Sequence, residues 1–153
     1  MVPYPFQLSG NCRNAQEIAQ WLCERFEWSE PPAQMLPPSG ESVREHRWKE
    51  LSEQAELSQQ AVKDWLERGV KAEDIAILSP YRPERSKGIA AVAEAFPDKA
   101  LRYSTINAFK GLQSPYVLLV DLDTSAFASR EDLWYVGATR AIVGLQVLAQ
   151  TRS

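Results

Sequence analysis

The chain has 153 residues, a length that suits one domain and buries roughly 70% of the surface of the unfolded chain. Hydrophobic residues make up 44% and charged residues 24%, as in ordinary globular proteins. With 17 basic and 20 acidic side chains the formal charge is −3, which argues against binding nucleic acid by bulk electrostatics alone.

Cysteine content and the amino-terminal sequence indicate the cellular compartment of the protein. Cys12 and Cys23 are too few for a disulfide framework or a zinc site, and they fit a reducing environment. The stretch MVPYPFQLSG lacks the positive start and apolar run of a signal peptide, and no apolar run is long enough to span a bilayer. These features predict a cytoplasmic protein with no membrane partner.

The first segments predict a strand, a helix and a connector. Residues 6–10 suit a short strand, and residues 14–26 carry apolar side chains at helical spacing. Asn14 and Glu17 have the spacing of a capping pair for that helix. Residues 27–42 hold two Pro-Pro pairs and a glycine, so we expect an exposed connector without regular structure.

Strands and helices alternate in the remaining segments. Residues 43–49 predict an edge strand. A helix is expected after it and ends at Gly69. Residues 74–79 are a continuous apolar run typical of a strand buried on both faces. The later expected elements are a helix over 86–96, strands over 101–106, 116–120 and 145–149, and a helix over 129–142 that Ser129 and Asp132 can cap.

This alternation, together with strands buried on both faces, predicts the fold class. We expect residues 1–153 to form one α/β domain of three layers, with a mainly parallel sheet and helices on both faces. In such folds ligands gather at the carboxyl ends of the strands.

Arg140 stands where the last predicted helix is otherwise apolar. At about 100° per residue it shares one face with Leu133 and Val136. Two interpretations are open: the guanidinium pairs inside its own domain with a carboxylate, Asp121 or Asp123 being candidates, or it serves a ligand outside the domain.

A second stretch with chemical potential is STINAFKGLQ, which begins at residue 104. A strand ending at Thr105 runs into a polar turn that contains Asn107, Lys110 and Gly111. A hydroxyl, an amide, an ammonium and a permissive backbone at the end of a strand suit a phosphate or another polar ligand. A loop with a solvated lysine is the alternative that composition alone favours. The later VLLVDLD predicts a core strand that ends in solvated acids.

Three segments together resemble a known family. TINAFKGLQ is similar to motif V of superfamily 1 helicases of the UvrD/Rep type, YVGATRA is similar to their motif VI, and LSGNCRNAQEIA resembles their motif IV. The segments occur in the family's order, and DIAILSP fits the strand expected between motifs IV and V, so the match spans nearly the whole chain. The resemblance implies a RecA-like domain, the second of two that close on ATP and move along single-stranded DNA.

The resemblance implies only half of a motor. A P-loop needs Gly-x-x-x-x-Gly-Lys-Ser/Thr, and none of the 7 glycines is followed by lysine. We therefore expect ATP and Mg²⁺ to bind only together with an N-terminal RecA-like P-loop domain, in the same natural chain or a separate one, and no ATPase activity from this chain alone. About ninety residues between Arg13 and Thr105 leave no room for the large inserted subdomain of UvrD and Rep.

Matching the motifs residue by residue gives candidate roles. Arg140 matches the motif VI arginine that reaches the γ-phosphate across the domain cleft, and Arg13 matches a motif IV arginine with a similar role, so both are catalytic candidates. The nucleotide-binding candidates are Gln113, Gly111, Tyr135 and Cys12, and the candidates for single-stranded DNA are Thr105, Asn107 and Lys110.

Three positions depart from the family's pattern. Gln113 replaces a glutamate that holds the nucleotide ribose, Asn107 replaces a histidine that touches DNA, and Cys12 stands where many relatives have an aromatic that stacks on adenine. Each change weakens the interaction. The alternative function is therefore a non-catalytic, helicase-derived adaptor that binds nucleic acid or protein.

Overall fold

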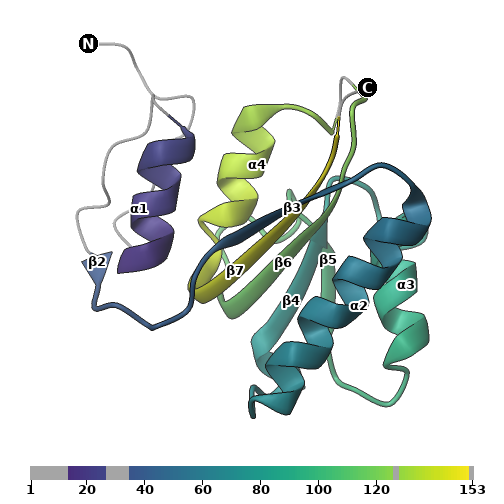
Figure 1. Cartoon of the computed structure of the whole chain (residues 1–153), viewed down its shortest axis with the longest axis horizontal. Coiled ribbons are helices and arrows are strands. Elements are labelled where there is room, and N and C mark those ends of the chain that lie inside the picture. The colour runs from purple at the N-terminus through teal and green to yellow at the C-terminus, as the bar shows by residue number, and fades with distance from the viewer. Residues whose placement is uncertain (1–13, 27–34, 126–127, 152–153) are drawn as a thin grey trace.

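The computed structural model describes residues 14–26, 35–125 and 128–151 (Figure 1). The helices are α1 (Gln16–Arg25), α2 (Leu51–Glu67), α3 (Lys87–Ala95) and α4 (Glu131–Ala138), with a short 3₁₀ turn, η1 (Ala72–Asp74), before β4. The strands are β1 (Asn14–Ala15), β2 (Met35–Leu36), β3 (Arg44–Trp48), β4 (Ile75–Ser79), β5 (Arg102–Thr105), β6 (Ser114–Leu122) and β7 (Ala141–Gln150). The strand predicted over 6–10, and the candidates Cys12 and Arg13, lie outside the described residues.

Five strands form the main sheet in the order β3-β7-β6-β4-β5, and every neighbouring pair is parallel. The mainly parallel sheet is therefore confirmed, and β3 lies at an edge as predicted. All five strands point the same way, so their first residues lie along one end of the sheet and their last residues along the opposite end. We call the end where β6 and β7 begin the amino edge, and the end where β4 and β5 finish the carboxyl edge. β1 and β2 form a separate parallel pair.

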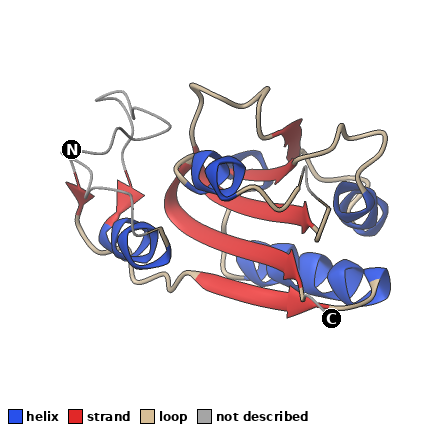
Figure 2. Ribbon diagram, turned by 90° about the horizontal axis from the view of Figure 1, so that it is seen from above, coloured by secondary structure: helices blue, strands red, loops and turns tan. Residues whose placement is uncertain are grey.

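Helices cover both faces of the sheet (Figure 2). All of β4 is buried, and its alternate side chains face opposite layers. Ile75 and Ile77 pack with side chains of α2 and α3, whereas Ala76 and Leu78 pack with those of α1 and α4. Burying a side chain of this size contributes about 1.5–3 kcal/mol, so the two apolar layers hold the helices in place. The predicted three-layer α/β class is confirmed.

The predicted capping pair at the first helix is wrong. α1 begins at Gln16, and no side chain caps its amino terminus. Asn14 lies in β1 instead, and its amide donates to the carbonyls of Thr139, before β7, and Ala141, the first residue of β7. The Glu17 carboxylate accepts hydrogen bonds from the backbone N–H groups of Ser39 (3.0 Å) and Gly40 (2.8 Å). Both polar side chains thus bind distant segments rather than the first turn of their own helix.

The connector expected over 27–42 contains a short strand, so the prediction of no regular structure is wrong at Met35–Leu36. These two residues form β2 and pair with β1 in parallel. Leu36 precedes a proline, and a residue in that position favours an extended backbone. The Pro-Pro pair therefore supports a strand at this point rather than preventing one.

The last predicted helix is shorter than expected. It was predicted over 129–142 with Ser129 and Asp132 as caps, but α4 ends at Ala138 and no side chain caps its start. Asp132 pairs with the neighbouring Arg130 instead. The chain leaves the helix because β7 begins only three residues after the end of α4. The helical face proposed for Arg140 does not exist.

The prediction that β6 ends in solvated acids is wrong for Asp121, which is 4% exposed. Its carboxylate accepts hydrogen bonds from Gln54 Nε2 (3.0 Å), Ser79 Oγ (2.7 Å), Ser86 Oγ and Gly88 N (3.0 Å). Its φ of 60° lies in the left-handed region, which aspartate tolerates better than most residues. Asp121 thus connects β6 to β4, α2 and the start of α3. Asp123 is half-buried and accepts a hydrogen bond from Tyr81 Oη at 2.8 Å.

In the described part of the chain, no helix has both the length and the apolar character that crossing a membrane requires.

Candidate functional site

Arg140 lies in the turn between α4 and β7, at the amino edge of the sheet, and is 6% exposed. Its guanidinium donates to Thr139 Oγ1 from Nη2 (3.0 Å) and Nε (3.3 Å), and to the Leu112 carbonyl from Nη1 (3.2 Å). Asp121 lies seven residues along β6 from that strand's start, which is about 20 Å at the rise of a strand. Within the described residues, Arg140 forms no ion pair with Asp121 or Asp123.

Segments that are far apart in the sequence meet around the backbone of Arg140. Four hydrogen bonds join them: Asn14 Nδ2 to the Thr139 carbonyl (3.1 Å) and to the Ala141 carbonyl (2.7 Å), Gln113 Nε2 to the Thr139 carbonyl (3.2 Å), and Ser114 N to the Arg140 carbonyl (2.9 Å). The three segments similar to helicase motifs IV, V and VI therefore converge at one place. Sequence reasoning missed Asn14 as a site residue because it assigned that side chain to a helix cap.

The other nucleotide-binding candidates have different surroundings. Gly111 is exposed, has a φ of 86° and directly precedes Leu112, so it lies in the same turn as the contact to Arg140. Tyr135 is 4% exposed, and its ring packs edge-on against Phe26 with the ring centroids 5.4 Å apart. The structure thus brings Gln113 and Gly111 to the amino edge and places Tyr135 in the core.

Thr105 lies at the carboxyl edge, the opposite edge of the sheet from Arg140. Its hydroxyl oxygen accepts a hydrogen bond from the backbone N–H of Ala108 at 2.9 Å, so this side chain stabilises the turn that follows β5. Asn107 and Lys110 are exposed in that turn. The structure therefore separates Thr105 from the arginine, whereas Lys110 lies two residues before Leu112, whose carbonyl contacts Arg140. The expectation that ligands gather at the carboxyl ends of the strands covers Thr105 but not Arg140 or Gln113.

One loop joins the two edges. Residues 106–113 run from the end of β5 at the carboxyl edge to the start of β6 at the amino edge. Ile106 (0% exposed) and Phe109 (5% exposed) pack into the layer of α1 and α4 and hold the loop against the sheet. Leu112, near the end of the loop, is 54% exposed. The loop thus has two buried anchors in its first half, exposed polar side chains beside them and an end that contacts Arg140.

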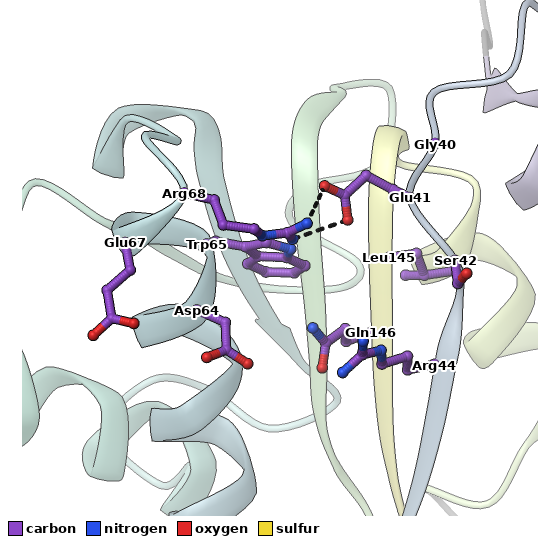
Figure 3. A pocket seen from close by; sticks show the side chains of 10 residues that line it. All are labelled: Gly40, Glu41, Ser42, Arg44, Asp64, Trp65, Glu67, Arg68, Leu145 and Gln146. Atoms are coloured by element: carbon purple, nitrogen blue, oxygen red, sulfur yellow. Dashed lines mark hydrogen bonds and ion pairs between the residues drawn. The ribbon is translucent and has the colours of Figure 1, made fainter.

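Pockets occur away from Arg140. A polar pocket of about 320 Å³ lies between α2, β7 and the segment that leads into β3 (Figure 3). The ion pair of Arg68 with Glu41, at 2.7 Å, borders it, and the hydrogen bond from Arg68 to this carboxylate raises the pKa of the guanidinium. A second pocket, of about 660 Å³, lies at the carboxyl edge and is lined by Arg25, Arg47 and Trp134 among others. Among the described residues, neither pocket is lined by one of the catalytic, nucleotide-binding or DNA-binding candidates.

The described residues contain no group of three or more histidine, cysteine, aspartate or glutamate side chains arranged to hold a metal ion.

Similarity to known proteins is found among solved structures. No family model matches the sequence, and no curated protein matches it. Among solved structures, the chain is similar to the C-terminal domain of a possible DNA helicase from Lactobacillus plantarum WCFS1, with a TM-score of 0.58. The two chains are 13% identical, and the match covers 91% of this chain and 87% of that one. A likeness at this identity concerns the fold, and it agrees with a RecA-like three-layer domain.

Proposed function

We propose that this chain is the C-terminal motor domain of an ATP-dependent superfamily 1 DNA helicase of the UvrD/Rep type. It would complete an ATP site in trans to a P-loop domain and contact single-stranded DNA. The observation that carries the proposal is the convergence of the three motif-like segments on the backbone of Arg140. The fold shared with a domain named as part of a possible DNA helicase supports it.

In this proposal Arg140 is the arginine finger and the amino edge faces the P-loop domain. A guanidinium stabilises the charge that develops on the γ-phosphate, and its arrival from the second domain makes hydrolysis depend on closure. Within the described residues, this guanidinium donates to the Thr139 hydroxyl and the Leu112 carbonyl. Hydrogen bonds to a charged acceptor such as a phosphate are roughly twice as strong as bonds to a neutral one. Arg13 would have a similar role.

The loop 106–113 would connect ATP to DNA. Thr105, Asn107 and Lys110 contact single-stranded DNA at one end of the loop, and the other end bonds the finger at Leu112. Ile106 and Phe109 anchor this loop in the core, and Lys110 lies two residues before Leu112. ATP and Mg²⁺ bind only in the assembled two-domain protein.

A second candidate function is the non-catalytic adaptor. The observation that favours it is the burial of the two key side chains: Arg140 is 6% exposed, and Tyr135 is 4% exposed in the core. An adaptor would keep the fold and bind nucleic acid or protein without turnover.

DNA-stimulated ATP hydrolysis separates the two functions. The assay uses the natural chain or complex that supplies the P-loop domain, and it compares Arg140→Ala with Arg130→Ala. Arg130 is an exposed arginine at the start of α4 and serves as the matched control. We expect Arg140→Ala to reduce kcat about a thousandfold and Arg130→Ala to leave it unchanged. An active wild type whose rate survives Arg140→Ala would remove the finger assignment, and an inactive wild type would favour the adaptor.

A further inference from the structure

Two side-chain amides hold the backbone around Arg140. Asn14, which is completely buried, donates through Nδ2 to the carbonyls of Thr139 (3.1 Å) and Ala141 (2.7 Å). Gln113 donates through Nε2 to the same Thr139 carbonyl at 3.2 Å. Arg140 lies between Thr139 and Ala141, and its carbonyl accepts a hydrogen bond from the backbone N–H of Ser114 at 2.9 Å. Three successive carbonyls are thus bonded from outside the turn.

These carbonyls need such donors because of where they lie. The last carbonyls of a helix have no partner within the helix, and the turn after α4 is buried and excludes water as a substitute. A carboxamide supplies two N–H donors, whereas an ionised carboxylate supplies none. A glutamate at position 113 would place its negative charge against the Thr139 carbonyl oxygen. The structure therefore gives a physical reason for glutamine at a position where glutamate is the family's usual residue.

The same hydrogen bonds constrain the guanidinium. Arg140 Nη1 donates to the carbonyl of Leu112, the residue before Gln113, and Nε and Nη2 donate to the hydroxyl of Thr139. The chain segments 112–114 and 139–141 are thus joined at both the backbone and the arginine side chain. A shift of either segment changes the direction in which the guanidinium leaves the turn.

We propose that Asn14 and Gln113 form a two-amide clamp that fixes the backbone on both sides of Arg140 and so positions its guanidinium. The clamp gives Gln113 a positioning role in place of a contact to the nucleotide ribose. Its relevance to ATP hydrolysis rests on the function proposed above for Arg140. The clamp itself is a property of this chain and is testable without a nucleotide.

Hydrogen exchange at the Arg140 side chain reports on the clamp directly. The whole chain is labelled with ¹⁵N-arginine, the Nε–H signal of Arg140 is assigned by its loss in Arg140→Lys, and its exchange rate is measured by NMR. Gln113→Glu keeps the size of the side chain and removes both donors. We expect about tenfold faster Nε–H exchange in this variant, because one buried carbonyl loses a partner and its turn loosens.

Gln59→Glu is the matched control. Gln59 is half-buried, and its Nε2 donates to the Ala91 carbonyl at 2.9 Å, the same interaction on a helix remote from Arg140. This variant should lose a similar amount of thermal stability and leave the Arg140 signal unchanged. Asn14→Ser, which keeps one donor in place of two, gives an independent variant with an intermediate increase, and it decides the question if Gln113→Glu does not fold.

The outcomes separate the clamp from the function. Faster exchange in Gln113→Glu and Asn14→Ser, but not in Gln59→Glu, supports the clamp. Unchanged exchange in the first two variants overturns it. If Gln113 instead holds the ribose, Gln113→Glu restores the family's usual residue and tightens nucleotide binding in the two-domain protein, with no effect on the arginine signal. Faster exchange in Gln113→Glu and Asn14→Ser, in a protein whose ATP hydrolysis is unchanged by Arg140→Ala, would support the clamp and reject the finger.

Discussion

Removal of the Asp121 carboxylate is expected to destabilise the domain far more than removal of Asp123, although the two acids lie on either side of Leu122, the last residue of β6. Asp121 is 4% exposed and accepts four hydrogen bonds from three other elements and the turn before α3. Asp123 is half-buried and accepts hydrogen bonds from the Tyr81 hydroxyl (2.8 Å) and the Ser125 N–H (3.0 Å), within the local loops.

The magnitude follows from the bonds lost. A hydrogen bond to a charged group contributes about 1.5–3 kcal/mol, so four bonds amount to about 6–12 kcal/mol before the cost of burying the charge is subtracted. That cost is several kcal/mol for a carboxylate, which leaves about 3–5 kcal/mol. The φ of 60° at Asp121 adds about 1 kcal/mol when alanine replaces aspartate. For Asp123→Ala we expect about 1 kcal/mol.

Urea unfolding followed by tryptophan fluorescence measures both variants. Asp121→Asn is the intermediate variant, because asparagine tolerates a positive φ and keeps one carbonyl oxygen as an acceptor. The expected order of stability is wild type, Asp123→Ala, Asp121→Asn and Asp121→Ala. A free energy of unfolding for Asp121→Ala within about 1 kcal/mol of that for Asp123→Ala would show that the four bonds do not hold the layers together.

Three further predictions follow from local contacts. Gly137→Ala places a Cβ 2.8 Å from Leu119 Cδ2, so it should lower the free energy of unfolding by about 1–3 kcal/mol in urea titrations, whereas an unchanged midpoint would mean that α4 shifts freely on the sheet. The backbone N–H of Ser39 lowers the pKa of Glu17 below 4.5, so this carboxylate stabilises the fold above pH 4.5 and less as the pH falls through the lowered pKa. Glu17→Gln should flatten the melting temperature as a function of pH in that acid range, and an unaltered profile would contradict the assignment. Burial raises the pKa of Tyr103 above 10.0, so its contribution is present below pH 10.0 and lost as the pH rises through the raised pKa. Tyr103→Phe should reduce the alkaline loss of stability in the same melting experiment, and an equally steep loss would assign it to other tyrosines.

The elements that sequence patterning predicts well are those set by apolar spacing. The continuous apolar run over 74–79 became β4, buried throughout, and the segment expected as the helix before Gly69 became α2. Gly69 closes that helix with a φ of 92°, as its position predicted. Such patterns succeed because burial of one face or stripe is the same requirement whatever the partner element is.

Polar side chains were predicted less well, because their partners are distant in sequence. Asn14 was assigned to a local helix cap but bonds residues 125 and 127 positions away. Asp121 was expected in solvent but is enclosed by α2 and α3, which no local rule indicates. For Arg140 the spacing suggested a helical face, but α4 ends at Ala138, two residues before Arg140, and β7 starts directly after it. In each case tertiary hydrogen bonds override local preference.

The most direct test of the central claim asks whether Arg140 enters the ATP site of a partner domain. The experiment uses the natural two-domain protein or complex. It measures two affinities: for ADP with aluminium fluoride, which mimics the transferring phosphate, and for ADP alone. The account predicts that Arg140→Ala weakens the aluminium fluoride complex about a hundredfold or more and leaves ADP binding unchanged, because the finger meets only the γ-phosphate position. Equal affinity of wild type and Arg140→Ala for the aluminium fluoride complex would contradict the account.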